Sequence, residues 1–194
     1  LIRQVNKAGI EVKLNTTATA EMIKAKGYDT ALVAAGAEPV ISRMPGADGE
    51  NVYNIVDVYS KNKDLGKNVV IIGAGRIGTE TGICLAKDGH KVMVLTSRKE
   101  MIEPEFIGPH NMLNQEQIYK NHPNFSYVLE ATATHISDGK VFYKDSTGSE
   151  KSVRADSFVI YAGLKPRMDE ALKFSGSAGQ VLFLGDCTGK NGTI

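Results

Sequence analysis

The sequence predicts an α/β fold, on three observations. Residues 69–72 are four β-branched apolar residues, typical of a buried parallel strand, and a glycine-rich turn and a helical pattern follow them. Residues 91–96 then repeat the strand pattern. Residues 29–39 and 157–166 each predict a buried apolar strand that ends in Ala-Gly-x-x-Pro. Since strands alternate with helices, we expect a Rossmann-like, three-layer domain, and the repeated ending indicates two related domains.

The turn after the first of these strands has the pattern G-x-G-x-x-G. Its first glycine allows a tight turn, its second lets the backbone approach a pyrophosphate, and its third lets the new helix pack against the strand. We expect that helix over about residues 76–88, so that its first amides and about half a unit of positive dipole charge face the anion. The sequence therefore predicts a dinucleotide site at Gly73, Ala74, Gly75, Arg76, Ile77 and Gly78.

The end of the next strand indicates which dinucleotide binds. About 20 residues after the first glycine, an NAD-binding unit carries Asp or Glu for the ribose 2′-hydroxyl. This chain has Thr96, Ser97, Arg98 and Lys99 there. Without a carboxylate a 2′-phosphate is not repelled, and the hydroxyls and cations are donors for it. We therefore favour NADP(H) over NAD(H); the alternative is a basic surface turn.

Two other turns are open to two interpretations. Ala35-Gly36 is either an ordinary tight turn or backbone that passes close to a cofactor. Gly185-Asp186 follows the last apolar strand, and its aspartate either caps a helix or lies against a ribityl or phosphate group. The residues alone do not separate these alternatives.

Other local patterns give further expectations. Alternation over residues 10–14 predicts a strand, Thr19 is expected to cap a short helix that Gly27 ends, and residues 140–154 predict an antiparallel hairpin. Cys84 is expected on the core side of its helix rather than as a nucleophile.

Composition excludes several classes of protein. The chain has 194 residues, 42% of them hydrophobic, and a formal net charge of +1, so nucleic acid is not an expected partner. No apolar stretch approaches the roughly 18 residues of a membrane span, and no signal peptide is recognisable. The two cysteines, Cys84 and Cys187, have neither a metal-site nor a C-x-x-C spacing, so a reducing cytoplasm is the expected location. The opening Leu-Ile-Arg-Gln suggests a fragment.

Together, these segments resemble flavoprotein reductases with two dinucleotide domains, and above all the C-terminal part of the multidomain old yellow enzyme relatives: 2-enoate reductase, 2,4-dienoyl-CoA reductase and trimethylamine dehydrogenase. The resemblance extends over nearly the whole chain. The stretches that carry it are 28–39, Pro45-Gly46, 66–80, 106–110 and 184–187.

The resemblance implies that an NAD(P)-binding domain, residues 66–166, is inserted into a partial FAD-binding domain made of residues 1–65 and 167–194. It also implies roles for single residues. Ala162 and Gly163 would lie near the nicotinamide, which Glu80 would also approach. Asp186 would hold the FAD, with Gly36 beside it.

The same resemblance implies an electron-input part that passes hydride from NAD(P)H to FAD. The FAD domain's own G-x-G-x-x-G is absent from this sequence, so we expect no tight FAD binding by this chain alone. The FMN barrel and the iron–sulfur region of the complete relatives would lie upstream. Two alternatives stay open: a thioredoxin- or disulfide-reductase type of flavoprotein, and a non-catalytic module that binds ADP or another nucleotide.

Overall fold

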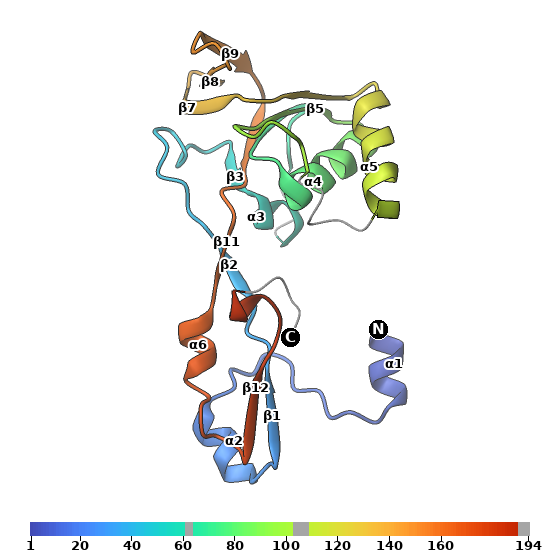
Figure 1. Cartoon of the computed structure of the whole chain (residues 1–194), viewed down its shortest axis with the longest axis vertical. Helices are drawn as coiled ribbons and strands as arrows, with labels where there is room; N and C mark the ends of the chain where they lie inside the picture. Colours follow the sequence, from blue (N-terminus) through green and yellow to red (C-terminus); the bar gives the residue numbers. More distant parts are fainter. Residues whose placement is uncertain (61–63, 103–108, 190–194) are drawn as a thin grey trace. The chain divides into compact units, whose positions relative to one another are not determined.

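The structure, a computed structural model, describes residues 1–60, 64–102 and 109–189. The chain divides into two compact units, one formed by Leu1–Glu38 with Lys165–Ile194 and the other by Pro39–Leu164 (Figure 1). Each unit is described by itself. Among the described residues, no helix combines the length and the apolar character needed to cross a membrane.

The larger unit is built on a parallel sheet of five strands, in the order β3-β10-β4-β5-β6. Every neighbouring pair in this sheet is parallel, as expected when helices connect the strands. The α/β, Rossmann-like prediction is confirmed. The strands are β3 (Val52–Asn54), β4 (Asn68–Ile72), β5 (Lys91–Leu95), β6 (Phe125–Val128) and β10 (Ser157–Ile160).

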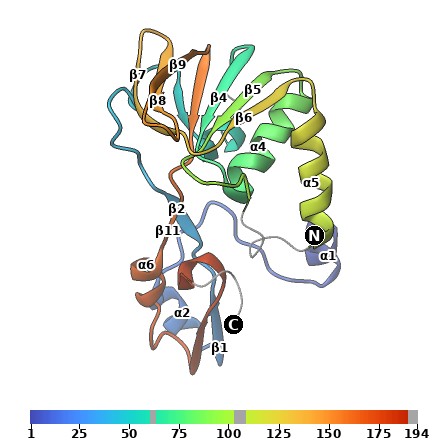
Figure 2. The ribbon, with the colours of Figure 1, turned by 45° about the horizontal axis from the view of Figure 1, so that its top comes forward.

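Helices and a second sheet cover the two faces of this parallel sheet (Figure 2). On one face, α4 (Gly75–Lys87) packs with the buried side chains of Val69, Ile71 and Val94, and α5 (Pro109–Asn121) lies next to α4. On the other face, Val70, Leu95 and Phe158 form a core with the second sheet. The result is three layers: helices, parallel sheet and antiparallel sheet.

The antiparallel sheet consists of β7 (Thr132–Ser137), β8 (Lys140–Lys144) and β9 (Glu150–Arg154). The predicted hairpin is confirmed as β8 and β9, and β7 adds a third strand with a register shift between Ala133 and His135. Val141 and Tyr143 are buried, which shows that one face of β8 turns to the core.

This unit begins at Pro39, before the predicted start of the NAD(P) domain at residue 66. The reason is that β3 pairs with β10 in the central sheet, and Ile55 at the start of α3 (Ile55–Ser60) is buried in the same core. Residues 52–60 therefore pack with the nucleotide fold.

Helix α4 confirms one expectation and corrects another. A Cβ on Gly82 would lie 2.7 Å from the Phe125 ring and 3.3 Å from Ile71 Cδ1. The helix therefore does pack closely against the sheet, as the glycine motif predicts. Cys84, expected in the core, is exposed. It lies one turn after Glu80 and two turns after Arg76, on the side of the helix that faces away from the core.

The smaller unit contains a parallel pair of strands, β1 (Thr30–Val33) and β12 (Gln180–Phe183), together with α1 (Ile2–Lys7), α2 (Ala20–Lys26), α6 (Met168–Leu172) and the 3₁₀ turn η2 (Gly185–Thr188). Thr19 caps α2 as predicted: its Oγ1 accepts the Met22 amide N–H at 3.3 Å. Val33, Ala171 and Cys187 form a small core.

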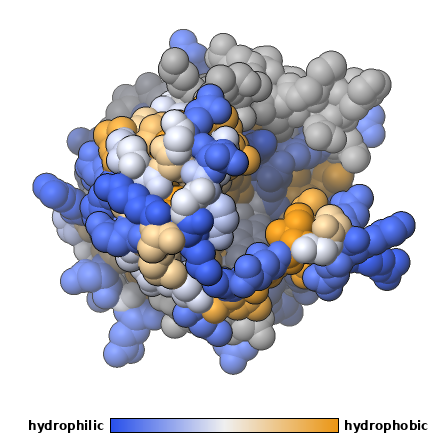
Figure 3. Space-filling view, turned by 90° about the horizontal axis from the view of Figure 1, so that it is seen from below, coloured by the Kyte–Doolittle hydropathy of each residue, from blue (hydrophilic) through white to orange (hydrophobic). Residues whose placement is uncertain are grey.

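Two expectations for this unit are wrong. Residues 10–14 form no strand and are all exposed, because no strand of the described chain pairs with them and a lone strand is not stable. The strand at 29–34 is not fully buried: β1 has a single partner, and Leu32 is 63% exposed. Figure 3, a view from below relative to Figure 1, shows hydrophobic residues in orange next to hydrophilic residues in blue on this surface.

The two Ala-Gly-x-x-Pro endings become a matched pair of strands. β2 (Ala37–Pro39) and β11 (Leu164–Pro166) form a two-stranded sheet, through which the chain passes on its way into the larger unit and out of it. The repeated Ala-Gly-x-x-Pro sequence thus lies at the two points where the chain passes from one unit to the other.

Candidate functional site

The turn between β4 and α4 can be formed only with its glycines. Gly73 has φ +109°, and a Cβ there would lie 2.0 Å from the Tyr161 carbonyl oxygen. A Cβ on Gly78 would lie 2.3 Å from the Gly73 oxygen. Gly75 has φ +78° but no such clash, since the nearest atom to its Cβ position is Tyr161 Cε1 at 3.9 Å, so its glycine is needed for the backbone conformation.

Backbone hydrogen bonds fix this turn at the carboxyl edge of the sheet. The Gly73 amide donates to the Leu95 oxygen at 2.8 Å, and the Gly75 amide donates to the Met101 oxygen at 2.8 Å. No side chain caps α4 at Ala74, and its first turn has no acidic residue. The positive end of this 13-residue helix therefore carries no negative side chain in its first turn, which suits an anion.

The turn after β5 lies beside the glycine turn. Thr96 is buried, and its hydroxyl accepts the Arg98 amide N–H at 3.2 Å. Backbone bonds from Glu130 to the Arg98 oxygen (2.9 Å) and from Ala131 to the Thr96 oxygen (2.8 Å) hold the turn. Arg98 Nη1 lies 4.0 Å from the position that a Cβ of Gly75 would take, so a cation lies next to the glycine turn.

These turns enclose a cavity of about 380 Å³. The cavity brings together seven of the residues that the sequence singled out: Gly73, Ala74, Thr96, Ser97, Arg98, Ala162 and Gly163. Its remaining lining residues are Ser42, Met44, Ile72, Leu95, Ala131, Thr132, Ala133, Ile160 and Tyr161. The site lies at the carboxyl ends of parallel strands, where α/β sheets bind their ligands.

Six other predicted residues of this unit do not line the cavity: Gly75, Arg76, Ile77, Gly78, Glu80 and Lys99. Gly75 and Gly78 determine the backbone conformation of the turn without lining the cavity. Glu80 is half-buried on α4, and one of its carboxylate oxygens accepts the Gln115 side-chain amide of α5 at 2.9 Å. Lys99 is exposed.

Sequence reasoning did not find Ser42 and Met44, which line the cavity from the segment before β3. The Gly, Pro and Asp content of residues 44–50 predicts only a loop or linker there. The place of this segment beside β7 depends on contacts with residues about a hundred positions away, and no local pattern predicts such contacts.

The predicted turns of the smaller unit also come together. β1 and β12 are parallel with Val33 opposite Phe183, so Ala35-Gly36 and Gly185-Asp186 follow the same ends of the two strands. Gly36 and Gly185 have φ of +71° and +70°, and a Cβ on either would meet no atom within 4 Å. Asp186 is exposed. Both turns thus leave backbone open to a ligand.

Residues 106–108, part of one stretch that carried the resemblance, lie outside the described residues. Within the described part of the chain, no group of three or more His, Cys, Asp or Glu side chains could hold a metal ion.

Known proteins match both the sequence and the fold. Cinnamate reductase of Clostridium sporogenes is 31% identical over 163 residues, which is 83% of this chain and 24% of that protein. NADH oxidase of Thermoanaerobacter brockii is 31% identical over 175 residues, 88% of this chain and 26% of that protein. The structure of a 2-naphthoyl-CoA reductase complex with 2-naphthoyl-CoA superposes with a TM-score of 0.83 at 30% identity, over 97% of this chain and 28% of that one.

The chain thus spans about a quarter of the length of these relatives. The resemblance to multidomain flavin oxidoreductases is confirmed, with this chain matching only a part of them. Proteins of this kind bind FAD and NAD(P)H, as the resemblance implied. Residues 2–182 match the family described as pyridine nucleotide-disulphide oxidoreductase, and the chain belongs to that family.

Proposed function

We propose that this chain is the electron-input part of an NAD(P)H-dependent flavin oxidoreductase. The observation that carries the proposal is the cavity at the carboxyl edge of the five-stranded sheet, enclosed by a glycine turn that tolerates no Cβ at Gly73. When bound there, a nicotinamide cofactor supplies a hydride for transfer to FAD. The chain itself binds and orients the cofactor.

The residues of the cavity suit a dinucleotide. Gly73 and Ala74 lie where the pyrophosphate meets the start of α4, whose first turn contains no acidic side chain. Gly75 gives the turn its left-handed backbone conformation, with φ +78°. Arg76, Ile77 and Gly78 form the first turn of the helix, whose dipole stabilises the negative charge.

The turn after β5 favours a phosphorylated ribose. Residues 96–99 contain no carboxylate, and Ser97 and Arg98 are exposed at the cavity. A guanidinium can bind a phosphate through two parallel hydrogen bonds. We therefore infer that NADP(H) binds more tightly than NAD(H), with Lys99 adding charge nearby.

The other assignments follow the family pattern. The larger unit, Pro39–Leu164, is the NAD(P) domain, with Ala162 and Gly163 at the nicotinamide end and Glu80 approaching it from α4. The smaller unit, Leu1–Glu38 with Lys165–Ile194, belongs to the FAD domain, in which Ala35, Gly36, Gly185 and Asp186 contact the flavin nucleotide. An FMN barrel and an iron–sulfur region upstream in the whole protein would receive the electrons.

Titration of the purified chain with NADPH, NADH and ADP tests this function. We expect NADPH to bind most tightly. Arg98→Ala should lower the NADPH preference over NADH by roughly tenfold or more, because a hydrogen bond to a charged group contributes about 1.5–3 kcal/mol. Lys91→Ala is the matched control: it removes an exposed cation at the opposite end of β5 and should leave the ratio unchanged.

The outcomes separate the competing functions. Tight ADP binding without any gain from the nicotinamide half would favour a purely structural nucleotide. An unchanged NADPH/NADH ratio in Arg98→Ala would show that the 2′-phosphate assignment is wrong. If none of the three ligands binds, the proposed function fails.

A further inference from the structure

The segment that leads from β2 to β3 is held against the cavity at two points. At one end, the Val40 amide donates to the oxygen of Gly163, a cavity residue, at 3.0 Å. At the other end, the Ile136 amide of β7 donates to the Pro45 oxygen at 2.9 Å. Residues 41–44 therefore lie between two fixed points, although they belong to no helix or strand.

Gly46 allows the hydrogen bond between the Pro45 oxygen and the Ile136 amide to form. Its φ is +82°, and a Cβ there would lie 2.0 Å from the Ile136 carbonyl oxygen. Any other residue would be strained and would have to move away from β7. The Pro45-Gly46 pair thus fixes the distance between this segment and the antiparallel sheet.

Between the two points the side chains alternate. Ser42 and Met44 are half-buried and line the cavity, whereas Ile41, Arg43 and Pro45 are exposed. The Ser42 hydroxyl accepts the Met44 amide N–H at 3.2 Å, which fixes the local bend. The segment therefore turns one flexible, polarisable side chain, that of Met44, toward the cavity.

The cavity end that faces this segment can be identified from its neighbours. Ala131 joins Thr96 by a backbone hydrogen bond, so the start of β7 is adjacent to the turn where the adenosine ribose is expected. Thr132 and Ala133 continue that wall, and Pro45 beside Met44 is bonded to the same strand. Met44 therefore lines the same cavity as the small side chains of Ala131, Thr132 and Ala133.

We propose that Met44 contacts the adenine ring of the bound dinucleotide and that Gly46 is a positioning residue for it. This inference rests on the proposed function of the cavity. A methionine sulfur near an aromatic ring edge forms a favourable contact. The wall is supplied from outside the strand–helix–strand unit that carries the glycine turn, so the nucleotide fold needs the preceding segment to complete its site.

The test measures binding of NADPH and of adenosine 2′,5′-bisphosphate, which lacks the nicotinamide half. We expect Met44→Ala to weaken both ligands by about fivefold, the size of one sulfur–aromatic contact. Gly46→Ala should weaken both at least as much, since it displaces the segment. Ile41→Ala, at a neighbouring position that is 74% exposed and outside the cavity, is the control and should change neither affinity by more than about twofold.

Each outcome decides the inference. Equal losses for both ligands in Met44→Ala support the adenine contact. Unchanged binding in that variant overturns the contact, and a loss for NADPH alone overturns its assignment to adenine. In both cases wild-type binding would still uphold the proposed function, whereas wild-type chain that binds neither ligand would overturn the function together with this inference.

Discussion

Gly73 is the residue at which the backbone of the site is most sensitive to substitution. Gly73→Ala would place a methyl group 2.0 Å from the Tyr161 oxygen at a φ of +109°. Strained φ costs of order 1–3 kcal/mol, and the clash adds to it. We expect the free energy of unfolding to fall by at least about 2 kcal/mol in urea titrations followed by circular dichroism.

Gly148 provides the matched control for this substitution. It has a similar positive φ of +80° in the turn between β8 and β9, but no atom lies within 4 Å of a Cβ. Gly148→Ala should therefore cost only the backbone term, about 1 kcal/mol. If both variants lost the same free energy of unfolding, the close approach of Gly73 to the Tyr161 oxygen would add nothing to the cost of the Gly73 substitution.

The predictability of the site differs from residue to residue. The steric demands on Gly73 and Gly78 follow from a local sequence pattern, so the glycine turn could be predicted before its coordinates were known. Met44 and Ser42 could not, because they reach the cavity through bonds from Val40 to Gly163 and from Ile136 to Pro45. Contacts over such sequence separations leave no periodic signal.

At the scale of the element, the packing of α4 depends on Gly82. A larger side chain there would meet the Phe125 ring, Ile71 Cδ1 and Val94 Cγ2, all of which belong to the packed core. Gly82→Leu should destabilise the chain by about 1–3 kcal/mol, the usual cost of overpacking a core. Thermal unfolding is the measurement. Lys87→Ala, at an exposed position of the same helix, should stay within about 0.5 kcal/mol of wild type.

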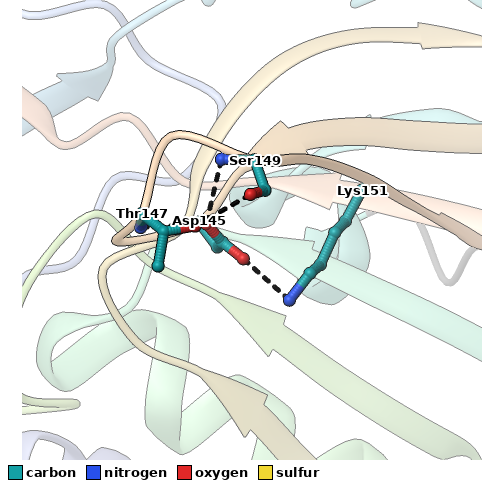
Figure 4. A network of polar contacts seen from close by, with 4 residues as sticks. All are labelled: Asp145, Thr147, Ser149 and Lys151. Atoms are coloured by element: carbon teal, nitrogen blue, oxygen red, sulfur yellow. Dashed lines mark hydrogen bonds and ion pairs between the residues drawn. The ribbon is translucent and has the colours of Figure 1, made fainter.

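The turn between β8 and β9 is an element stabilised by one carboxylate (Figure 4). Asp145 pairs with Lys151 Nζ at 2.7 Å and accepts hydrogen bonds from the Thr147 hydroxyl (2.6 Å) and amide (2.9 Å) and from the Ser149 amide (3.1 Å). Its bond to Lys151, followed by that from the Thr147 hydroxyl, lowers the pKa of Asp145 well below the ordinary value. The charged form is therefore the one that stabilises the turn.

This shift sets the direction of a pH dependence. A carboxyl whose pKa is lower in the folded chain adds stability above its unfolded pKa of about 3.9, and this stability is lost as the pH falls through the folded value. Asp145→Asn should therefore unfold at lower urea than wild type near about pH 7, and the gap should narrow near about pH 3. Glu150→Gln, at an exposed neighbouring site, is the control. A gap that does not depend on pH would contradict the role of the charge.

Other elements show why local patterns can mislead. The alternation over residues 10–14 is the pattern of a half-buried strand, yet no described strand pairs with it, and pairing is what makes a strand. For Cys84, the 3.6-residue period correctly predicted the helix, but the assignment of its faces depended on which side meets the sheet. In both cases the outcome depended on which element lies next to the segment in the fold, and a local sequence pattern does not contain that information.

At the scale of the whole molecule, the two units differ in how much of the protein surrounds each proposed ligand site. The larger unit surrounds its cavity with turns from several strands and buries a core on both faces of a five-stranded sheet. In the smaller unit, the turns that we propose for the flavin follow β1 and β12, and Leu32 and Leu182 on those strands are 63% and 39% exposed. We therefore expect the two cofactors to be held with very different affinities by this chain.

Purification of the chain with added FAD tests this difference. The turns at Gly36 and Gly185 offer open backbone at one edge of a single strand pair, so few contacts offset the entropic cost of fixing a large ligand. We expect visible flavin absorbance to be lost on gel filtration, while the same sample still binds NADPH by titration. The NADPH result serves as the control for folding. Flavin that stays bound in equal amount to protein would show that these two turns suffice for the FAD site.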